Sequence, residues 1–125
     1  MNEYVLIVED DSDSREILSK MIGIQGWKTQ VAPDGQIALS MIDERLPLLI
    51  LLDLVIPKVS GFKIISKLKS NNNTRDIPII VISGFGADER LEKLGVNHIL
   101  PKGNFTIANL RKLLSQYLVS EEIIH

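Results

Sequence analysis

Short apolar runs without a charged residue constrain the fold of this chain more than any other feature. Three of them are Tyr4–Val8, Leu48–Leu52 and Ile77–Ile82. A strand with one face in water alternates apolar and polar residues, whereas a strand buried on both faces of a parallel sheet reads as a continuous apolar run. The three runs therefore predict central strands of a parallel sheet that is covered on both sides.

Segments with apolar residues three and four positions apart separate the runs, as expected for helices packed on a sheet. Ser12 and Asp13 are candidate N-caps of the first, with Glu16 placed as in a capping box, and Asp34 and Ser60 are expected to cap the next two. The apolar residues expected to mark the buried helix faces are Ile17, Leu18, Met21, Ile22, Ile37, Ala38, Met41, Ile42, Phe62, Ile65, Leu68, Ile107, Leu110, Leu114 and Tyr117.

Two shorter strands, Lys28–Ala32 and His98–Leu100, and a short helix around Asp88–Leu94 complete five strand-helix units. Alternating strands and helices predict an α/β fold with right-handed crossovers. The 125 residues fit one domain. We expect that domain to span residues 1–120, followed by a short C-terminal tail at 121–125.

Charge and composition narrow the classes of function. The net charge of −2 disfavours direct binding to nucleic acid, which requires neutralisation of phosphates. The chain has no cysteine, which excludes disulfides and thiolate metal sites. No apolar segment approaches the length of a membrane span, and no signal peptide is recognisable at the N-terminus. These features predict a cytoplasmic protein that does not enter a membrane.

Acidic residues follow two of the apolar runs at the point where each predicted strand ends. Glu9 and Asp10 follow the first run, and Asp53 closes the second. Ligand sites of parallel sheets lie beyond the carboxyl ends of the strands, so these acids are expected to face one another. Two carboxylates about 5 Å apart repel by roughly 3 kcal/mol at an effective dielectric of 20, which favours a bound cation. Oxygen ligands of this kind suit Mg²⁺, and Lys102 offers a further positive charge.

The pattern of strand-end residues resembles the receiver domain of two-component response regulators. The resemblance extends from Tyr4 to Leu118 and implies a flavodoxin-like (βα)5 fold with helices on both faces of a five-stranded sheet in the order 2-1-3-4-5. The matching positions are Glu9-Asp10, Asp53, Pro57, Gly61, Ser83-Gly84 and Lys102.

The resemblance implies that Asp53 is a phosphoacceptor. It would take a phosphoryl group from a histidine kinase or a phosphotransfer protein, and the modified domain would present a changed surface to a downstream effector. Lys102 would pair with the acceptor carboxylate and then with the phosphoryl oxygens, and the hydroxyl of Ser83 would donate to one of those oxygens. The domain would act as a monomer or a weak dimer. Its catalysis would be limited to Mg²⁺-dependent self-phosphorylation and autodephosphorylation.

The resemblance also implies the ligands of the Mg²⁺ ion. Asp10 and Asp53 would bind it through carboxylate oxygens, Val55 through its backbone carbonyl and Glu9 through water. Asp11 is expected to be a solvated turn residue.

The chain departs from the pattern of the family at Ile99, at Gly103 and in the stretch from Ser83 to Gly95, which is shorter than usual and predicts a short fourth helix. Ile99 stands where most receivers have an aromatic residue that reports phosphorylation, which suggests a weaker switch or one that runs through the backbone after Ser83. Gly103 follows the lysine in place of the usual proline. Val55 and Phe85 are apolar at places that flank the path of attacking water in the family, which predicts a long-lived acyl phosphate.

Two other functions compete with phosphoacceptance. Ile99 and Gly103 leave room for a receiver-like interaction module that binds partners without a phosphorylation cycle. A small Mg²⁺-dependent phosphohydrolase with an aspartyl intermediate is the other alternative. Such enzymes commonly carry a second acid two residues past the nucleophile, and this chain has Val55 there.

Overall fold

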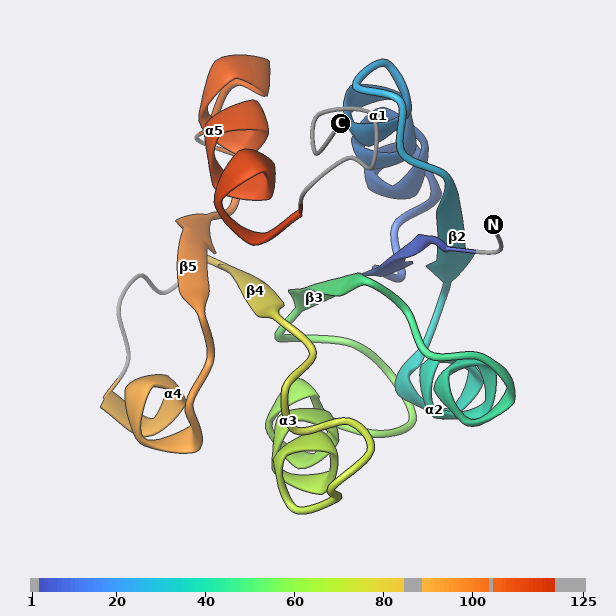
Figure 1. Cartoon of the computed structure of the whole chain (residues 1–125), viewed down its shortest axis with the longest axis vertical. Helices are drawn as coiled ribbons and strands as arrows, with labels where there is room; N and C mark the ends of the chain where they lie inside the picture. The colour runs from blue at the N-terminus through green and yellow to red at the C-terminus, as the bar shows by residue number, and fades with distance from the viewer. Residues whose placement is uncertain (1–2, 85–88, 104, 119–125) are drawn as a thin grey trace, which may run out of the picture.

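The computed structural model describes residues 3–84, 89–103 and 105–118. Strands and helices alternate along this part of the chain, as the apolar runs predicted (Figure 1). In chain order the elements are β1 (Val5–Val8), α1 (Ser12–Gly23), β2 (Thr29–Ala32), α2 (Gly35–Glu44), β3 (Leu49–Asp53), α3 (Gly61–Lys69), β4 (Ile79–Ser83), α4 (Glu89–Leu94), β5 (His98–Pro101) and α5 (Ile107–Tyr117).

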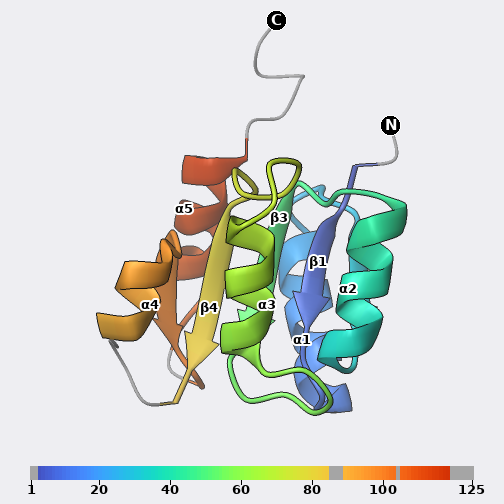
Figure 2. The ribbon, with the colours of Figure 1, turned by 90° about the horizontal axis from the view of Figure 1, so that it is seen from below.

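The five strands form one parallel sheet in the order β2-β1-β3-β4-β5. Helices α1 and α5 cover one face, and α2, α3 and α4 cover the other (Figures 1 and 2). The α/β, flavodoxin-like architecture predicted from the sequence is confirmed. Because every strand runs in the same direction, all five carboxyl ends lie at one edge of the sheet.

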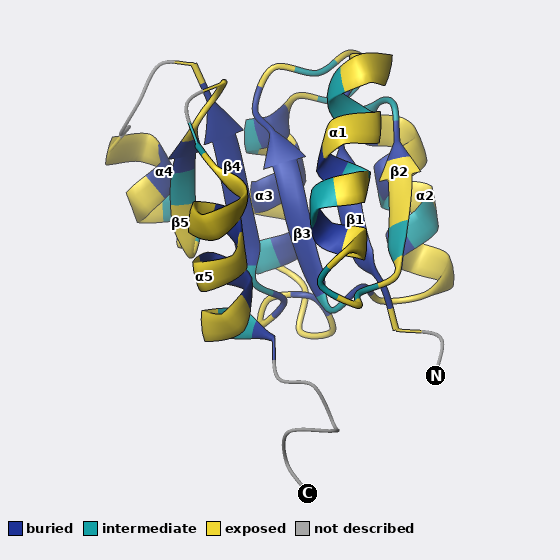
Figure 3. Ribbon diagram, turned by 90° about the horizontal axis from the view of Figure 1, so that it is seen from above, coloured by how far each residue is buried: buried dark blue, intermediate teal, exposed yellow. Residues whose placement is uncertain are grey.

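Successive residues of the central strands β1, β3 and β4 pack into two separate cores. In β1, Val5 and Ile7 pack toward α1 and α5, whereas Leu6 and Val8 pack toward α2, α3 and α4. All four residues are buried, and the three central strands form the buried centre of the molecule (Figure 3). Burial of each such side chain contributes about 1.5 to 3 kcal/mol to folding. This two-sided burial explains why the strands carry no alternation of polar residues.

The helices bury a narrower stripe than the spacing of apolar residues suggested. Ile17 is 59% exposed, and Ile37 and Ile107 are each 42% exposed, because each lies at the margin of the helix face that meets the sheet. In α3 the buried positions include Ile64, whereas Phe62 is only half-buried. Three further predicted residues, Met21, Met41 and Tyr117, are partly buried. The predicted residues that are buried are Leu18, Ile22, Ala38, Ile42, Ile65, Leu68, Leu110 and Leu114.

The predicted caps of α2 and α3 are confirmed, and that of α1 is corrected. Asp34 and Ser60 each accept a hydrogen bond from a backbone N–H in the first turn of their helix. In α1 the cap is Asp11, whose carboxylate accepts from the backbone N–H of Ser14 at 2.9 Å. Asp11 has the extended backbone that a cap requires, whereas Ser12 is already helical.

Some predictions fall on parts of the chain outside the described residues. These are the tail at 121–125, Phe85, and Asp88 at the start of the fourth helix, of which Glu89–Leu94 is described. Among the described residues, no helix combines the length and the apolar character needed to cross a membrane.

Candidate functional site

The carboxyl edge of the sheet gathers the acidic residues that the sequence placed at strand ends. Strands β1 and β3 are neighbours in register, with Val8 opposite Leu52, so Glu9 and Asp53 follow side by side. Glu9, Asp10 and Asp53 each offer one carboxylate oxygen, and these oxygens lie within 4.8 Å of one another. The expected convergence of acids on one point is therefore what the structure shows.

Burial differs among the three acids. Glu9 and Asp53 are each 2% exposed, whereas Asp10 is exposed. One oxygen of Asp53, Oδ1, accepts a hydrogen bond from the backbone N–H of Val55 at 3.1 Å, and Oδ2 accepts from Lys102 at 2.7 Å. These two bonds fix the plane of the Asp53 carboxylate.

Lys102 reaches the acids from the loop after β5. Its Nζ lies 2.7 Å from Asp53 Oδ2 and 3.9 Å from Glu9 Oε1. Its backbone N–H donates to the carbonyl of Ser83 at 2.9 Å, which anchors the loop to β4. The hydrogen bond to Asp53 raises the pKa of Lys102, so the ammonium stays charged. Gly103 follows with φ of +73°, a backbone conformation that proline cannot adopt.

The electrostatics of the site favour an additional cation. Burial, followed by the hydrogen bond and the negative charge of Asp53, raises the pKa of Glu9 from 4.5 to about 7. One lysine thus faces three carboxylates, two of them buried. A cluster of oxygen ligands with excess negative charge fits a hard divalent cation such as Mg²⁺, which binds through one or two carboxylates.

The loop between β3 and α3 is held close to the acids by two glycines. The N–H of Gly35 donates to the carbonyl of Pro57 at 3.2 Å, and that of Gly61 donates to Leu54 at 3.3 Å. A Cβ on Gly35 would overlap the carbonyl oxygen of Val59, and one on Gly61 would lie 2.7 Å from the carbonyl of Leu54. Only glycine permits these approaches without a shift of the loop.

Two other predicted site residues lie on this edge. The side chain of Val55, on that loop directly after Asp53, is 64% exposed. Ser83 is 2% exposed at the end of β4, opposite Pro101 of β5. Ser83 and Lys102 are thus joined through the backbone as well as placed on the same edge.

Ile99, one of the departures from the family pattern, lies on β5, three residues before Lys102. Ile99 is half-buried and packs against the core shared by α2, α3 and α4. His98, one residue earlier, is exposed on β5. At the position expected for a mobile aromatic ring the chain therefore has an aliphatic side chain packed on the core.

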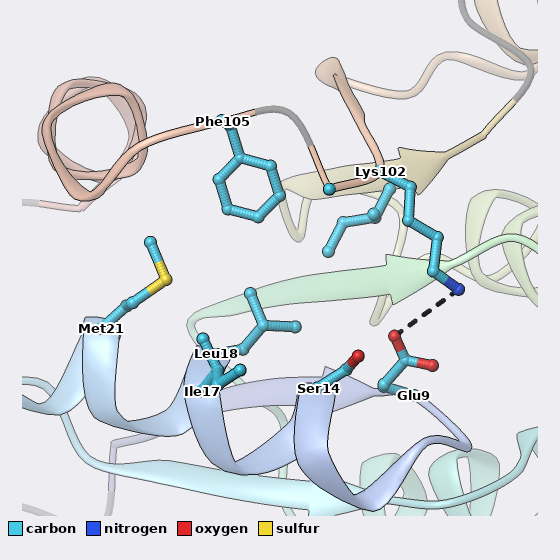
Figure 4. A pocket seen from close by; sticks show the side chains of 9 residues that line it. Glu9, Ser14, Ile17, Leu18, Met21, Lys102 and Phe105 are labelled. Atoms are coloured by element: carbon cyan, nitrogen blue, oxygen red, sulfur yellow. Dashed lines mark ion pairs between the residues drawn. The ribbon is translucent and has the colours of Figure 1, made fainter.

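An apolar groove adjoins the acids between α1 and the loop that precedes α5. Its volume is about 210 Å³, and its lining runs from Glu9 and Lys102 to Ile17, Met21 and Phe105 (Figure 4). Ile17 and Met21 were predicted as part of a buried helix face, whereas Phe105 belongs to none of the predicted patterns. Ile17 is 59% exposed, so the apolar stripe of α1 is wider than the part that packs on the core, and its outer residues line the groove.

Arg15 is a further residue of the site that the sequence analysis missed. From the first turn of α1 its Nη1 donates to the backbone carbonyl of Glu9 at 3.1 Å and to that of Asp10 at 2.9 Å. An arginine that lies five residues after Asp10 in the sequence could have suggested an ion pair with the acids. The actual bonds go to main-chain oxygens, which no side-chain pattern reveals.

Comparisons with known proteins agree with this geometry. The family model described as the response regulator receiver domain matches residues 5–115. The polar-differentiation response regulator DivK of Brucella anthropi is 32% identical over 105 residues, covering 82% of this chain and 85% of DivK. The response regulator PleD of Caulobacter vibrioides is 31% identical over 129 aligned positions, covering 98% of this chain and 28% of PleD. The chain thus corresponds to most of one relative and to less than a third of the other.

Solved structures share the fold. Chemotaxis response regulator CheY4 of Vibrio cholerae superposes with a TM-score of 0.86 at 22% identity, covering 94% of this chain and 100% of CheY4. The receiver domain of the sensor histidine kinase PA1611 from Pseudomonas aeruginosa gives 0.83 at 24% identity, covering 94% and 98%. Together with the family match over residues 5–115, the sheet order and the strand-end acids, these likenesses lead to one conclusion: the chain belongs to the response regulator receiver domain family of two-component systems.

Proposed function

We propose that this receiver domain takes a phosphoryl group onto Asp53 in the presence of Mg²⁺ and changes its surface for a downstream partner. One observation carries the proposal. A nearly buried carboxylate, Asp53, lies 2.7 Å from the ammonium of Lys102 and within 4.8 Å of two further carboxylates. This arrangement offers a nucleophilic oxygen beside positive charge and beside ligands for a divalent cation.

The chemistry follows from the charges. A carboxylate and a phosphoryl group are both anionic, so transfer depends on neutralisation and in-line positioning rather than on a general base. An oxygen of Asp53 attacks phosphorus, the new O–P bond forms, and the bond to the donor nitrogen breaks as that nitrogen keeps the electron pair. Lys102 then pairs with the transferred oxygens, and the hydroxyl of Ser83 is the candidate for a second contact.

Mg²⁺ would neutralise negative charge on the phosphoryl oxygens and on the acids. Asp10 and Asp53 would be its carboxylate ligands, Val55 would supply a backbone carbonyl and Glu9 would act through water. The donor set found here supports this assignment. The PA1611 receiver domain, whose structure has a magnesium ion coordinated in the active site cleft, has the same fold.

The proposed donor is a histidine kinase or a phosphotransfer protein. Beside the acids, the groove at Ile17, Met21 and Phe105 offers an apolar surface for such a protein (Figure 4). We propose that the domain and its donor act in the cytoplasm. We propose that the domain works as a monomer or a weak dimer, that its effector is a protein, and that neither nucleic acid nor membrane is a direct partner.

Phosphorylation by acetyl phosphate tests the proposal. The wild-type chain should gain one phosphoryl group in the presence of Mg²⁺, detected by intact-protein mass spectrometry and removed by hydroxylamine. Asp53→Asn and excess EDTA should each abolish the gain. Modification of Asp53→Asn to the wild-type extent would show that the acceptor is another residue.

A second candidate, partner binding without a phosphorylation cycle, is favoured by the packing of Ile99. It predicts that a partner binds wild type and Asp53→Asn equally and that acetyl phosphate modifies neither. The phosphohydrolase alternative has less support, because an apolar residue, Val55, occupies the place where the second acid would be needed. Turnover of simple phosphate esters by the purified chain would reinstate it.

A further inference from the structure

Arg15 holds the segment that carries two of the acids. One guanidinium nitrogen, Nη1, donates to the carbonyls of Glu9 and Asp10, at 3.1 and 2.9 Å. The backbone N–H of Arg15 also donates to the carbonyl of Asp11 at 3.0 Å. That bond is the first backbone bond of helix α1, so the side chain of Arg15 itself binds two consecutive carbonyls of the connection between β1 and α1.

The side chains of Glu9 and Asp10 are held less firmly than that of Asp53. The Glu9 carboxylate accepts a hydrogen bond from the backbone N–H of Asp11 at a long 3.3 Å, and Lys102 lies 3.9 Å from it. The side chain of Asp10 is exposed. The carboxylates repel one another. Their oxygens can stay close enough to share one cation only if other groups hold the backbone of Glu9 and Asp10 in place.

We propose that Arg15 is a positioning residue of the cation site, acting through the main chain of Glu9 and Asp10 and not as a counter-charge to the carboxylates. The proposal rests on the proposed function, since it assumes that the acids bind Mg²⁺. Groups that orient metal ligands through hydrogen bonds typically change metal affinity by about 10- to 100-fold when they are removed.

The two roles of an arginine predict opposite signs. A positive charge near the site repels Mg²⁺, so its loss, if charge were the whole effect, would tighten Mg²⁺ binding. Loss of the hydrogen bonds to the two carbonyls lets the segment after β1 relax and weakens Mg²⁺ binding. The direction of the change therefore separates a positioning role from an electrostatic one.

Mg²⁺ titrations of the full chain, followed by amide chemical shifts or calorimetry, test the proposal. Arg15→Gln should raise the dissociation constant about tenfold. Arg15→Lys keeps the charge but loses the fork of donors, so it should also raise the dissociation constant. The matched control is Lys20→Gln on the same helix. It removes the same charge, and Lys20 pairs with Glu16 at 3.1 Å instead of contacting the acidic segment. Its dissociation constant should stay within about twofold of wild type.

Each outcome decides a different point. Equal or tighter Mg²⁺ binding by Arg15→Gln overturns the positioning role while leaving the proposed function intact. Absence of Mg²⁺ binding by the wild type overturns the proposed function and the role of Arg15 with it. If urea unfolding shows that Arg15→Gln does not fold, the Mg²⁺ affinity of Arg15→Lys tests the positioning role, because this variant keeps the positive charge. Weaker binding then supports the positioning role, and wild-type affinity rejects it.

Discussion

Replacement of Glu9 by glutamine should change how the stability of the metal-free domain depends on pH. Glu9 is 2% exposed and lies beside Asp53, and burial together with that neighbour raises its pKa to about 7. Glutamine has nearly the same shape and can donate a hydrogen bond to Asp53, but it carries no charge at any pH. The variant Glu9→Gln therefore removes one titration and leaves the packing in place.

The sign follows from proton binding. Between pH 4.5 and about 7 the folded state holds a proton on Glu9 that the unfolded state has lost, so stability falls as the pH rises. The contribution is complete below about pH 4.5 and is lost as the pH passes about 7. At about 1.4 kcal/mol per pH unit, the gap from 4.5 to about 7 amounts to up to about 3 kcal/mol.

Urea unfolding in EDTA from pH 5 to pH 8 measures this effect. We expect the wild type to lose up to about 3 kcal/mol relative to Glu9→Gln over that range, so that the variant is the more stable protein at pH 8. Saturating Mg²⁺ should reduce the difference, because a bound cation favours the charged carboxylate. A difference between the two proteins that stays constant from pH 5 to pH 8 would refute the assignment of the raised pKa to Glu9.

Three further predictions address the lysine, the glycines and the exposed valine. Lys102→Met should slow phosphorylation by acetyl phosphate roughly tenfold or more, and an unchanged rate would remove the ammonium from the mechanism. Gly35→Ala should destabilise the domain by about 1 to 3 kcal/mol in urea because its Cβ would overlap the carbonyl oxygen of Val59. A Cβ added at Gly23 would meet no atom within 4 Å, so Gly23→Ala should stabilise the domain by about 0.5 to 1 kcal/mol. Equal effects of the two substitutions would contradict the claim that Gly35 is needed for close contact with the loop after β3. The acyl phosphate should persist for minutes or longer with Mg²⁺ and decay faster in Val55→Asn, and decay of the wild type within seconds would reject shielding by the valine.

Much of the fold could be predicted from the sequence because a strand that is buried on both faces consists of an uninterrupted run of apolar residues. Val5–Val8 and Leu49–Asp53 are buried at every position, so the apolar runs located them almost to the residue. The margins of the helices were less predictable. Ile17 follows the helical spacing but is 59% exposed, because the width of the buried face depends on how closely neighbouring helices approach.

The site was predictable where it depends on strand order and less so where it depends on loop geometry. Acids and the lysine at the ends of parallel strands must meet at one edge, and Lys102 does contact Asp53. Asp11, Ser12 and Asp13 are all residues that cap helices well, and only the path of the chain after β1 selects Asp11. The bonds of Arg15 to backbone carbonyls have no counterpart in the sequence pattern.

A structure of the domain with Mg²⁺ and beryllofluoride, a mimic of the phosphoryl group, would test the shared cation most directly. We predict a Mg²⁺ ion bound by the carboxylates of Asp10 and Asp53 and by the carbonyl of Val55, with beryllofluoride on Asp53 and Lys102 in contact with its fluorine atoms. A Mg²⁺ ion bound away from these acids, or an Asp53 that remains unmodified at saturating beryllofluoride and Mg²⁺, would contradict the proposed function.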